Sequence, residues 1–401
     1  MTKHQTEASK EPSKEVSFAG IDDTMAQAAN PNEPQGLKRR HFMGAVLALD
    51  AAALLAACGG GGGGSSAPTH YQWVVTTLAG TGSTEFADGT GGTATFHTPR
   101  GIALDANGNV YVADLSNHRI RKITEAGVVS TLAGAGTSGA TDGIGGTATF
   151  NSPSGVAVDT SGNVYVADKD NQRIRKITAA GVVSTLAGTG ATGADDGTSG
   201  TATFNSPFGV AVDTSSNVYV ADSDNNLIRK INSAGVVSTV AGVAGVADYL
   251  DGTAGTATFN SPLGVAVDTF GNLYVADLNN FVIRKITPAG VVSTWAGTAG
   301  SAGAVNGSAG TASFYYPTGV AADTNGAVYI ADIYNHLILK INPEGVLSTL
   351  AGAGSNGYVN GTAATAKFND PACIAIDNGG SVYVADQTNN SIRKIVRTHL
   401  G

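Results

Sequence analysis

The chain has 401 residues, a formal net charge of −8 and only 13% charged residues, and glycine alone supplies 55 positions. This composition excludes a coiled coil and a charged disordered chain, and the acidic balance argues against nucleic acid as a partner, because nucleic-acid binders ordinarily show a basic footprint. The 42% hydrophobic fraction is enough for a sizeable core, so we expect many short strands joined by turns.

The N-terminal segment, residues 1–57, has the features of an export signal. Residues 1–37 are polar and without periodicity, which predicts disorder. A basic cluster, Lys38-Arg39-Arg40, then precedes an apolar stretch from Phe42 to Ala57 that is interrupted by Asp50. A membrane-spanning helix needs about 20 apolar residues, so this shorter stretch fits the apolar region of a signal better.

Two short motifs in this segment resemble bacterial export motifs. Arg39, Arg40 and Phe42 resemble the twin-arginine signal, and Leu55-Ala56-Ala57-Cys58 resembles the lipobox of bacterial lipoproteins. The resemblance implies acylation of Cys58 and a lipid-anchored protein exported to the cell envelope, on the periplasmic side or at the cell surface. A buried helical hairpin is the alternative interpretation, and translation from Met25 is a second start consistent with the sequence.

A glycine-rich tether follows the predicted lipidation site. Six consecutive glycines lead into Ser65-Ser66-Ala67-Pro68, so residues 58–70 form a flexible linker of roughly 20 Å. The predicted organisation is therefore an export signal over 1–57, a tether over 58–70 and a folded domain over 71–401.

Six repeats make up that folded domain. The proline that opens each copy falls at Pro99, Pro153, Pro207, Pro262, Pro317 and Pro371. In the second copy the apolar runs and turn residues predict four strands, at 155–159, 164–167, 173–177 and 182–186. Four short strands per repeat are typical of a β-propeller blade, whose two faces are covered by its neighbours.

The two ends of the repeat region predict how the ring closes. The last copy stops after its third strand, at Ile395-Val396, whereas residues 73–80 match the fourth-strand segment 127–134 of the first copy. We expect the N-terminal strand to complete the sixth blade, because pairing the two ends removes an open sheet edge.

The repeated text resembles the NHL repeat family. Its motifs read Pro-x-Gly-Val-Ala-Val-Asp, Gly-Asn-Val-Tyr-Val-Ala-Asp and Asn-x-x-Ile-Arg-Lys-Ile, and the resemblance covers residues 72–397. It implies an all-β, six-bladed NHL propeller with four strands per blade. The family includes scaffolds, extracellular sensors, RNA-binding domains and a few lyases, so the resemblance does not fix an activity.

Residues that recur in every copy are interpreted as architecture. We expect the phenylalanines equivalent to Phe96 to anchor the connections between blades, and the tyrosines equivalent to Tyr111 to pack between blades. The aspartates equivalent to Asp114 fit either a ring of cation ligands or turns that bond their own loop, and the asparagines that follow favour turns. Arginines such as Arg121 suggest either phosphate binding or long stems with their charged heads in water.

Signs of catalysis are weak in this sequence. From the glycine onward, no first strand introduces an acid, base or metal ligand in one blade only, and Cys373 is expected to be a small buried residue. His97, His118 and His336 are too scattered to predict a zinc site. We therefore predict no catalytic residue, metal or cofactor, and keep a metal-dependent hydrolase or lyase with a site at the channel as the alternative.

The loop after each second strand varies from copy to copy. Repeat proteins often use such variable loops for binding. The candidate binding residues are His118, Gln172, Asn226, Phe281, Tyr334, His336 and Asn390. Phe281, Tyr334 and His336 form the best aromatic patch, on the fourth and fifth blades. The predicted function is a non-catalytic recognition or scaffold propeller that binds a protein or glycan partner.

Overall fold

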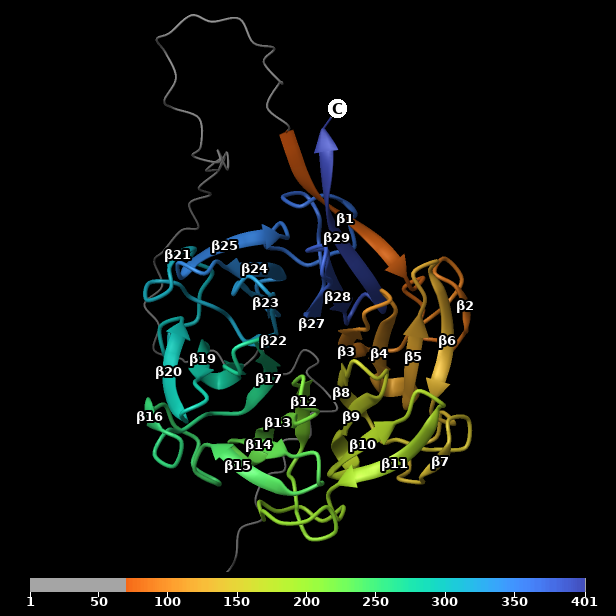
Figure 1. Cartoon of the computed structure of the whole chain (residues 1–401). Coiled ribbons are helices and arrows are strands. Elements are labelled where there is room, and N and C mark those ends of the chain that lie inside the picture. Colours follow the sequence, from red (N-terminus) through yellow and green to blue (C-terminus); the bar gives the residue numbers. More distant parts are fainter. Residues whose placement is uncertain (1–69, 401) are drawn as a thin grey trace, which may run out of the picture. The chain divides into compact units, whose positions relative to one another are not determined.

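Six antiparallel sheets stand around a central channel like the blades of a propeller (Figure 1). The structure is a computed structural model and describes residues 70–400. The export motifs at Arg39, Arg40, Phe42 and Leu55, the lipidation site Cys58 and the tether lie outside the described residues. The six-bladed all-β fold expected from the repeats is confirmed.

The second blade shows how each repeat is built. From the channel outward its strands are β8 (Pro153–Val158), β9 (Val164–Asp168), β10 (Arg173–Ile177) and β11 (Val182–Ala187). The four predicted strands are therefore confirmed, with ends displaced by one or two residues. A turn at Gly162, where φ is +79°, reverses the chain between the first two strands, a conformation that favours glycine.

The other blades repeat this order of strands. The first blade contains β3 (Pro99–Leu104), β4 (Val110–Asp114), β5 (Arg119–Ile123) and β6 (Val128–Ala133). The third contains β12 (Pro207–Val212), β13 (Val218–Asp222), β14 (Leu227–Ile231) and β15 (Val237–Ala241). The fourth contains β17 (Pro262–Val267), β18 (Leu273–Asp277), β19 (Val282–Ile286) and β20 (Val291–Ala296). The fifth contains β22 (Pro317–Ala322), β23 (Val328–Asp332), β24 (Leu337–Ile341) and β25 (Val346–Ala351).

The long connections between blades contribute a short fifth strand that the sequence did not predict. It pairs antiparallel with the outer strand of five blades, as β2 (Gly89–Thr90), β7 (Gly143–Ile144), β16 (Gly252–Thr253), β21 (Gly307–Ser308) and β26 (Gly361–Thr362). In the third blade the same place is held by a single bridge between Gly197 and Val237. The connections are thus part of the sheets rather than free loops.

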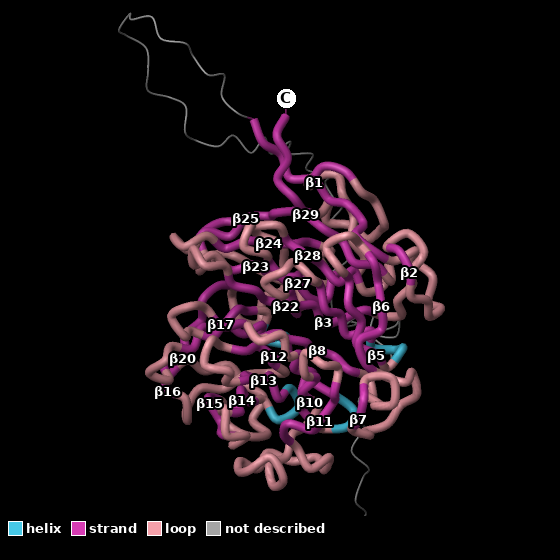
Figure 2. The backbone as a smooth tube through the Cα atoms, turned by 45° about the vertical axis from the view of Figure 1, so that its right-hand side comes forward, coloured by secondary structure: helices cyan, strands magenta, loops and turns pink. Residues whose placement is uncertain are grey.

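The ring closes through its two ends, as predicted. The sixth blade contains β27 (Pro371–Ile376), β28 (Val382–Asp386) and β29 (Ser391–Leu400), and β1 (His70–Ala79) supplies its outer strand. Val75 of β1 lies opposite Ile395 of β29. The expected end of the last strand at residues 395–396 is wrong, because β29 continues beside β1 to Leu400 and the pair extends beyond the ring (Figures 1 and 2).

In the described part of the chain, helical structure is confined to one-turn segments, drawn cyan in Figure 2. They are the 3-10 helices η2 (Leu115–Asn117), η3 (Lys169–Asn171), η4 (Ser223–Asn225) and η5 (Leu278–Asn280). Each begins directly after a second strand. Within residues 70–400, no helix has the length and apolar character needed to cross a membrane.

The core lies between the blades. One cluster joins Tyr165 and Ile174 of the second blade to Phe204 and Val220 of the third. The six phenylalanines of the Phe96 set are all 0% exposed, and burying each stabilises the fold by about 1.5–3 kcal/mol. These phenylalanines, which lie in the connections, are thus packed between neighbouring blades.

The first strands approach one another closely around the channel. A Cβ atom on Gly101 would lie 2.5 Å from the carbonyl oxygen of Ser154 in the next blade, so only glycine fits there. Cys373 occupies the equivalent position in the sixth blade, where it is partly buried. Burial raises the pKa of its thiol, which keeps the sulfur protonated and a poor nucleophile.

Candidate functional site

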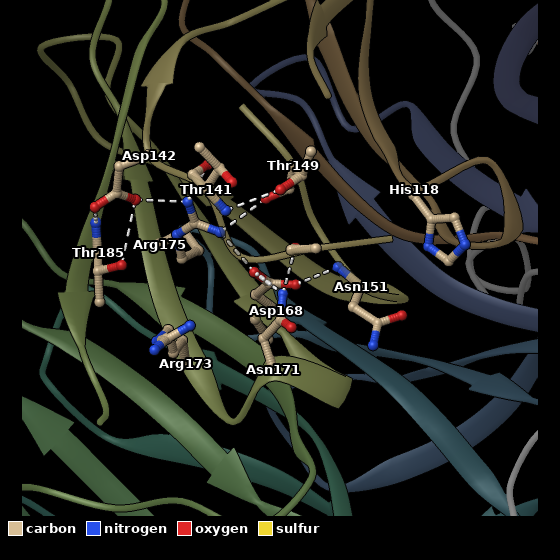
Figure 3. Close-up of polar contacts among 12 residues, drawn as sticks. His118, Thr141, Asp142, Thr149, Asn151, Asp168, Asn171, Arg173, Arg175 and Thr185 are labelled. Atoms are coloured by element: carbon tan, nitrogen blue, oxygen red, sulfur yellow. Dashed lines mark hydrogen bonds and ion pairs between the residues drawn. The ribbon is translucent and has the colours of Figure 1, made fainter. Parts of the chain in front are cut away.

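A buried ion network ties the middle strands of five blades to the preceding connection, and Figure 3 shows it in the second blade. Asp168 accepts hydrogen bonds from the Asn151 N–H at 2.7 Å, from Asn171 Nδ2 at 2.8 Å and from Arg175 Nη1 at 2.7 Å. The second amino group of Arg175 lies 2.5 Å from Asp142 in the connection. The Asp168 and Arg175 side chains are both 0% exposed.

The network recurs in four other blades, with Asn360 in place of the connection aspartate in the sixth, and it corrects two expectations. Its arginines are Arg121, Arg229, Arg284 and Arg393, all 0% exposed, so the prediction that such heads lie in water is wrong. Each guanidinium instead lies beside the phenylalanine ring of its own repeat, for example 5.1 Å from the Phe150 centroid for Arg175. The aspartates are structural, but they bond the preceding connection and an arginine rather than their own loop alone.

The fifth blade lacks this arginine. Leu339 replaces it, and Asn306 stands where the second blade has Asp142. Burial raises the pKa of Asp222, which is paired with Arg229, to about 6, and that of the unpaired Asp332 to about 7. The fifth blade therefore carries a buried carboxyl that no arginine neutralises.

One end of the ring, here called the loop face, carries the one-turn segments after the second strands and the residues just before each proline. Six of the seven candidate binding residues, all except Tyr334, occupy the last position of these turns, where φ is between +49° and +58°. Five of them accept a hydrogen bond of 2.7–3.3 Å from the N–H before the proline of the next blade: His118, Gln172, Asn226, His336 and Asn390. Although these side chains differ in type, each of them links its blade to the next through this hydrogen bond.

Phe281 has no acceptor atom and takes part in a different structure. It packs with Tyr315, Tyr316 and Tyr334 in an aromatic cluster, with ring centroids 5.0–6.2 Å apart. Tyr315 is 40% exposed and the other three rings are partly buried. Of the predicted patch of Phe281, Tyr334 and His336, the cluster contains the first two and adds two tyrosines from the connection into the fifth blade. His336 makes no ring contact with the cluster and instead accepts the Asp370 N–H.

The backbone of the aromatic cluster is strained. Phe281 has φ of +57° and Tyr316 has φ of +60°, in the left-handed region that bulky residues avoid. Such a conformation costs about 1–3 kcal/mol and persists where the surroundings impose it. The positions equivalent to Tyr316 hold the smaller residues Thr98, Ser152, Ser206, Ser261 and Asp370.

The channel mouth on the loop face contains an arginine that the sequence analysis missed. Arg100 of β3 is 8% exposed, and its Cζ lies 4.4 Å from the ring centroid of Phe208 in β12. The first and third blades are not neighbours, so these side chains meet across the channel. Among residues 70–400, Arg100 makes no ion pair, and its Nε has no hydrogen-bond partner.

Missing Arg100 has a clear cause. The prediction of no catalytic residue rests on the first-strand residues that follow the glycine. Arg100 lies before that glycine, between Pro99 and Gly101. This position reads Arg100, Ser154, Phe208, Leu263, Thr318 and Ala372 in the six copies. It breaks the repeat more than any other first-strand position, which is the signal that could have found the site.

The opposite end of the ring, here called the turn face, holds two surface cavities near the first and second blades. Asp105 and Asp159 line both of them. These carboxylates already accept bonds from their own turns and from a tyrosine hydroxyl, as Asp105 does from Tyr111 at 3.0 Å. In the described part of the chain, no three His, Cys, Asp or Glu side chains are grouped to hold a metal ion.

Comparison with known proteins follows the repeat structure. Residues 96–123, 150–177, 204–231, 314–341 and 368–395 match the NHL repeat. NHL repeat-containing protein 2 of Homo sapiens is 31% identical over 319 residues, which cover 70% of this chain and 44% of that protein. The chain spans less than half the length of the curated relatives it matches.

Two solved structures share the fold at low sequence identity. A protein of unknown function from Bacteroides thetaiotaomicron is 21% identical, with a TM-score of 0.65 over 82% of this chain and 77% of that one. A protein from the same organism described as an auxiliary nutrient binding protein is 17% identical, with a TM-score of 0.63 over the same shares. The likenesses and the matched segments therefore show a six-bladed β-propeller in which five of the six repeats match the NHL repeat.

Proposed function

We propose that this protein is a non-catalytic recognition propeller that binds a protein or glycan partner through its loop face. The aromatic cluster carries the proposal, because the fourth and fifth blades place the bulky rings of Phe281 and Tyr316 at left-handed backbone positions that hold polar residues in the other blades. Tyrosine and phenylalanine are also enriched at the centres of binding surfaces. The description of a similar propeller as a nutrient binding protein is in keeping with a binding role.

The rest of the molecule supports a scaffold for this face. Five blades repeat the same buried network, and the linking residues on the loop face hold neighbouring blades together. Such a frame presents the aromatic cluster on rigid elements, which reduces the entropy lost on binding.

The export and anchoring of the protein form the second part of this proposal. The twin-arginine-like residues Arg39 and Arg40, followed by the lipobox-like Cys58, support a lipid-anchored protein of the cell envelope. Intact mass and fractionation from the native cells test it. We expect an acylated species that begins at Cys58 and sediments with membranes, whereas a soluble full-length species contradicts anchoring.

The binding surface is tested by a double substitution, Phe281→Ala with Tyr334→Ala. We expect capture of the partner from envelope material to fall at least tenfold, because the two rings both pack against Tyr315 and Tyr316. A matched control is Phe270→Ala, an aromatic residue that is 75% exposed and lies in a turn after a first strand. Unchanged capture by the double variant, in protein that remains folded, contradicts the proposed surface.

A further inference from the structure

Arg100 differs from every other buried arginine of the described chain. The five network arginines are 0% exposed and each is paired with a fully buried aspartate, at 2.7–2.9 Å. Arg100 is also more than nine-tenths buried, yet no Asp or Glu of residues 70–400 forms an ion pair with it. A buried guanidinium without a counter-ion destabilises the folded state, and no ion pair within the described residues offsets this cost.

The surroundings of Arg100 leave its charge without an anion. Burial lowers its pKa to about 10, which still leaves it protonated at neutral pH. The two titratable groups that act on it are the thiol of Cys373 and the hydroxyl of Tyr334. Burial raises the pKa of both groups, so both are neutral at neutral pH. The channel mouth therefore holds one unneutralised positive charge.

The aromatic cluster stands beside this charge. Tyr334 of the cluster is close enough to Arg100 for its hydroxyl to interact electrostatically with the guanidinium. Tyr316, also of the cluster, packs against the apolar group of Phe208, Leu263 and Leu278 at the same mouth. Phe208 in turn stacks on the Arg100 guanidinium. The site thus combines one guanidinium with several amphipathic rings, each with an apolar face and a hydroxyl at its edge.

We propose that Arg100 and the aromatic cluster form one binding site for a carboxylate-bearing saccharide, a chain that contains uronic acid residues. This inference rests on the proposed binding function and names its ligand class. The planar guanidinium matches a carboxylate through two parallel hydrogen bonds. Tyrosine rings match the apolar face and hydroxyl rim of a sugar, and Phe208, Leu263 and Leu278 already pack against one another beside Tyr316.

The binding test uses purified full-length protein and a panel of oligosaccharides. The panel contains oligomers of galacturonate, glucuronate and mannuronate, each beside its methyl ester, which removes the negative charge but keeps the ring. We expect at least one uronate to bind and its ester to bind at least about 30-fold more weakly, the loss typical for one partner of a buried charge pair.

Variants of Arg100 assign the binding to this residue. Arg100→Leu should reduce affinity for the uronate at least about 30-fold and raise the melting temperature, because it removes an unneutralised buried charge. Arg100→Lys keeps the charge without the planar fork and should give an intermediate affinity. Arg397→Leu, on the outer part of β29, removes one positive charge elsewhere and should leave binding unchanged.

The outcomes separate this inference from the proposed function. Equal binding of the uronates and their esters, unaffected by Arg100→Leu but lost in the Phe281→Ala, Tyr334→Ala variant, keeps the binding surface and overturns the carboxylate site. Binding of no uronate in the panel, or preference for a peptide with a free C-terminal carboxylate, also overturns it. Loss of binding in Arg100→Leu together with a lower melting temperature shows a structural role and overturns it as well, unless Arg100→Lys restores stability and still discriminates between acid and ester.

Discussion

At the residue scale, the loop face shows how side chains of different types can fulfil one requirement. The last position of each turn holds histidine, glutamine or asparagine in five blades, and each accepts the N–H before the next proline. What the sequence shows as variation is an acceptor kept in different chemical forms. The exception, Phe281, lies where the aromatic cluster replaces the bond.

Replacing Gln172 tests the acceptor requirement. Its Oε1 accepts the Ser206 N–H at 2.7 Å, so Gln172→Leu leaves that N–H without its partner and should lower the free energy of unfolding by about 1–3 kcal/mol. Gln172→Asn, which copies the third and sixth blades, should lose much less. Urea unfolding measures both variants, and equal losses would show that the hydrogen bond is not the cause.

His118 makes the same link sensitive to acid. Burial lowers the pKa of His118 below its usual 6.5, opposed by Asp170 and assisted by Arg119, and only unprotonated Nδ1 can accept the Ser152 N–H. Since the pKa is lower in the folded state, this stability is present above pH 6.5 and lost as the pH falls through the folded value. His118→Gln should therefore lose less stability than the wild type between pH 7.5 and 5. The reverse order in melting temperatures would contradict this assignment.

At the element scale, each blade is held to its connection by charge as well as by the core. The connection brings Asp142 to Arg175, which also reaches Asp168 at the end of β9. This explains why the connections add a short strand to the sheets instead of forming loose loops. The fifth blade keeps the fold without the arginine, at the expense of a buried carboxyl with a raised pKa.

Arg175→Leu gives the second blade the leucine that the fifth blade has at the same position, Leu339. The variant should lose about 3–5 kcal/mol at pH 8, because Asp168 remains buried without its guanidinium. Burial already raises the pKa of Asp168, and losing Arg175 raises it further, so the carboxyl can take up a proton at pH 5 and the loss should be smaller there. Arg173→Leu, at a partly exposed position of the same strand, should change stability by less than about 1 kcal/mol. A loss that is independent of pH would contradict the charge argument.

At the scale of the whole molecule, closure by the chain ends turns six repeats into one ring. Strand β1 pairs with both β29 and β26, so the sixth blade is complete only when residues from the two ends meet. Val75 is fully buried in this blade, whereas its neighbour Thr76 is exposed.

Val75→Asp tests how much the closure contributes. A charge on this strand faces the core, so we expect a loss of more than about 3 kcal/mol and a broader unfolding transition as the ring opens. Thr76→Asp places the same charge on the solvent side and should change stability by about 0.5 kcal/mol or less. Similar effects of the two substitutions would contradict closure through β1.

Much of the fold could be predicted because the sequence holds six copies of one repeat, and each copy shows the same strand and turn residues. The strands, the closing strand and the packing of Phe96 and its equivalents all follow from local sequence. The arginine network could not be predicted in this way, because Asp142 and Arg175 meet only when the connection folds back onto the outer strands. Within the candidate site, Phe281 and Tyr334 were predicted, whereas Tyr315, Tyr316 and Arg100 depend on segments that lie outside the variable loops.

Amide hydrogen exchange tests most directly the claim that the loop face binds the partner. The partner is first isolated from envelope material on the immobilised propeller, and exchange is then measured with and without it. We predict slower exchange on the loop face, at residues 97–101, 278–282, 315–318 and 333–337, and no change at the turns that follow the first strands. Protection confined to those turns, beside the cavities lined by Asp105 and Asp159, would contradict the account.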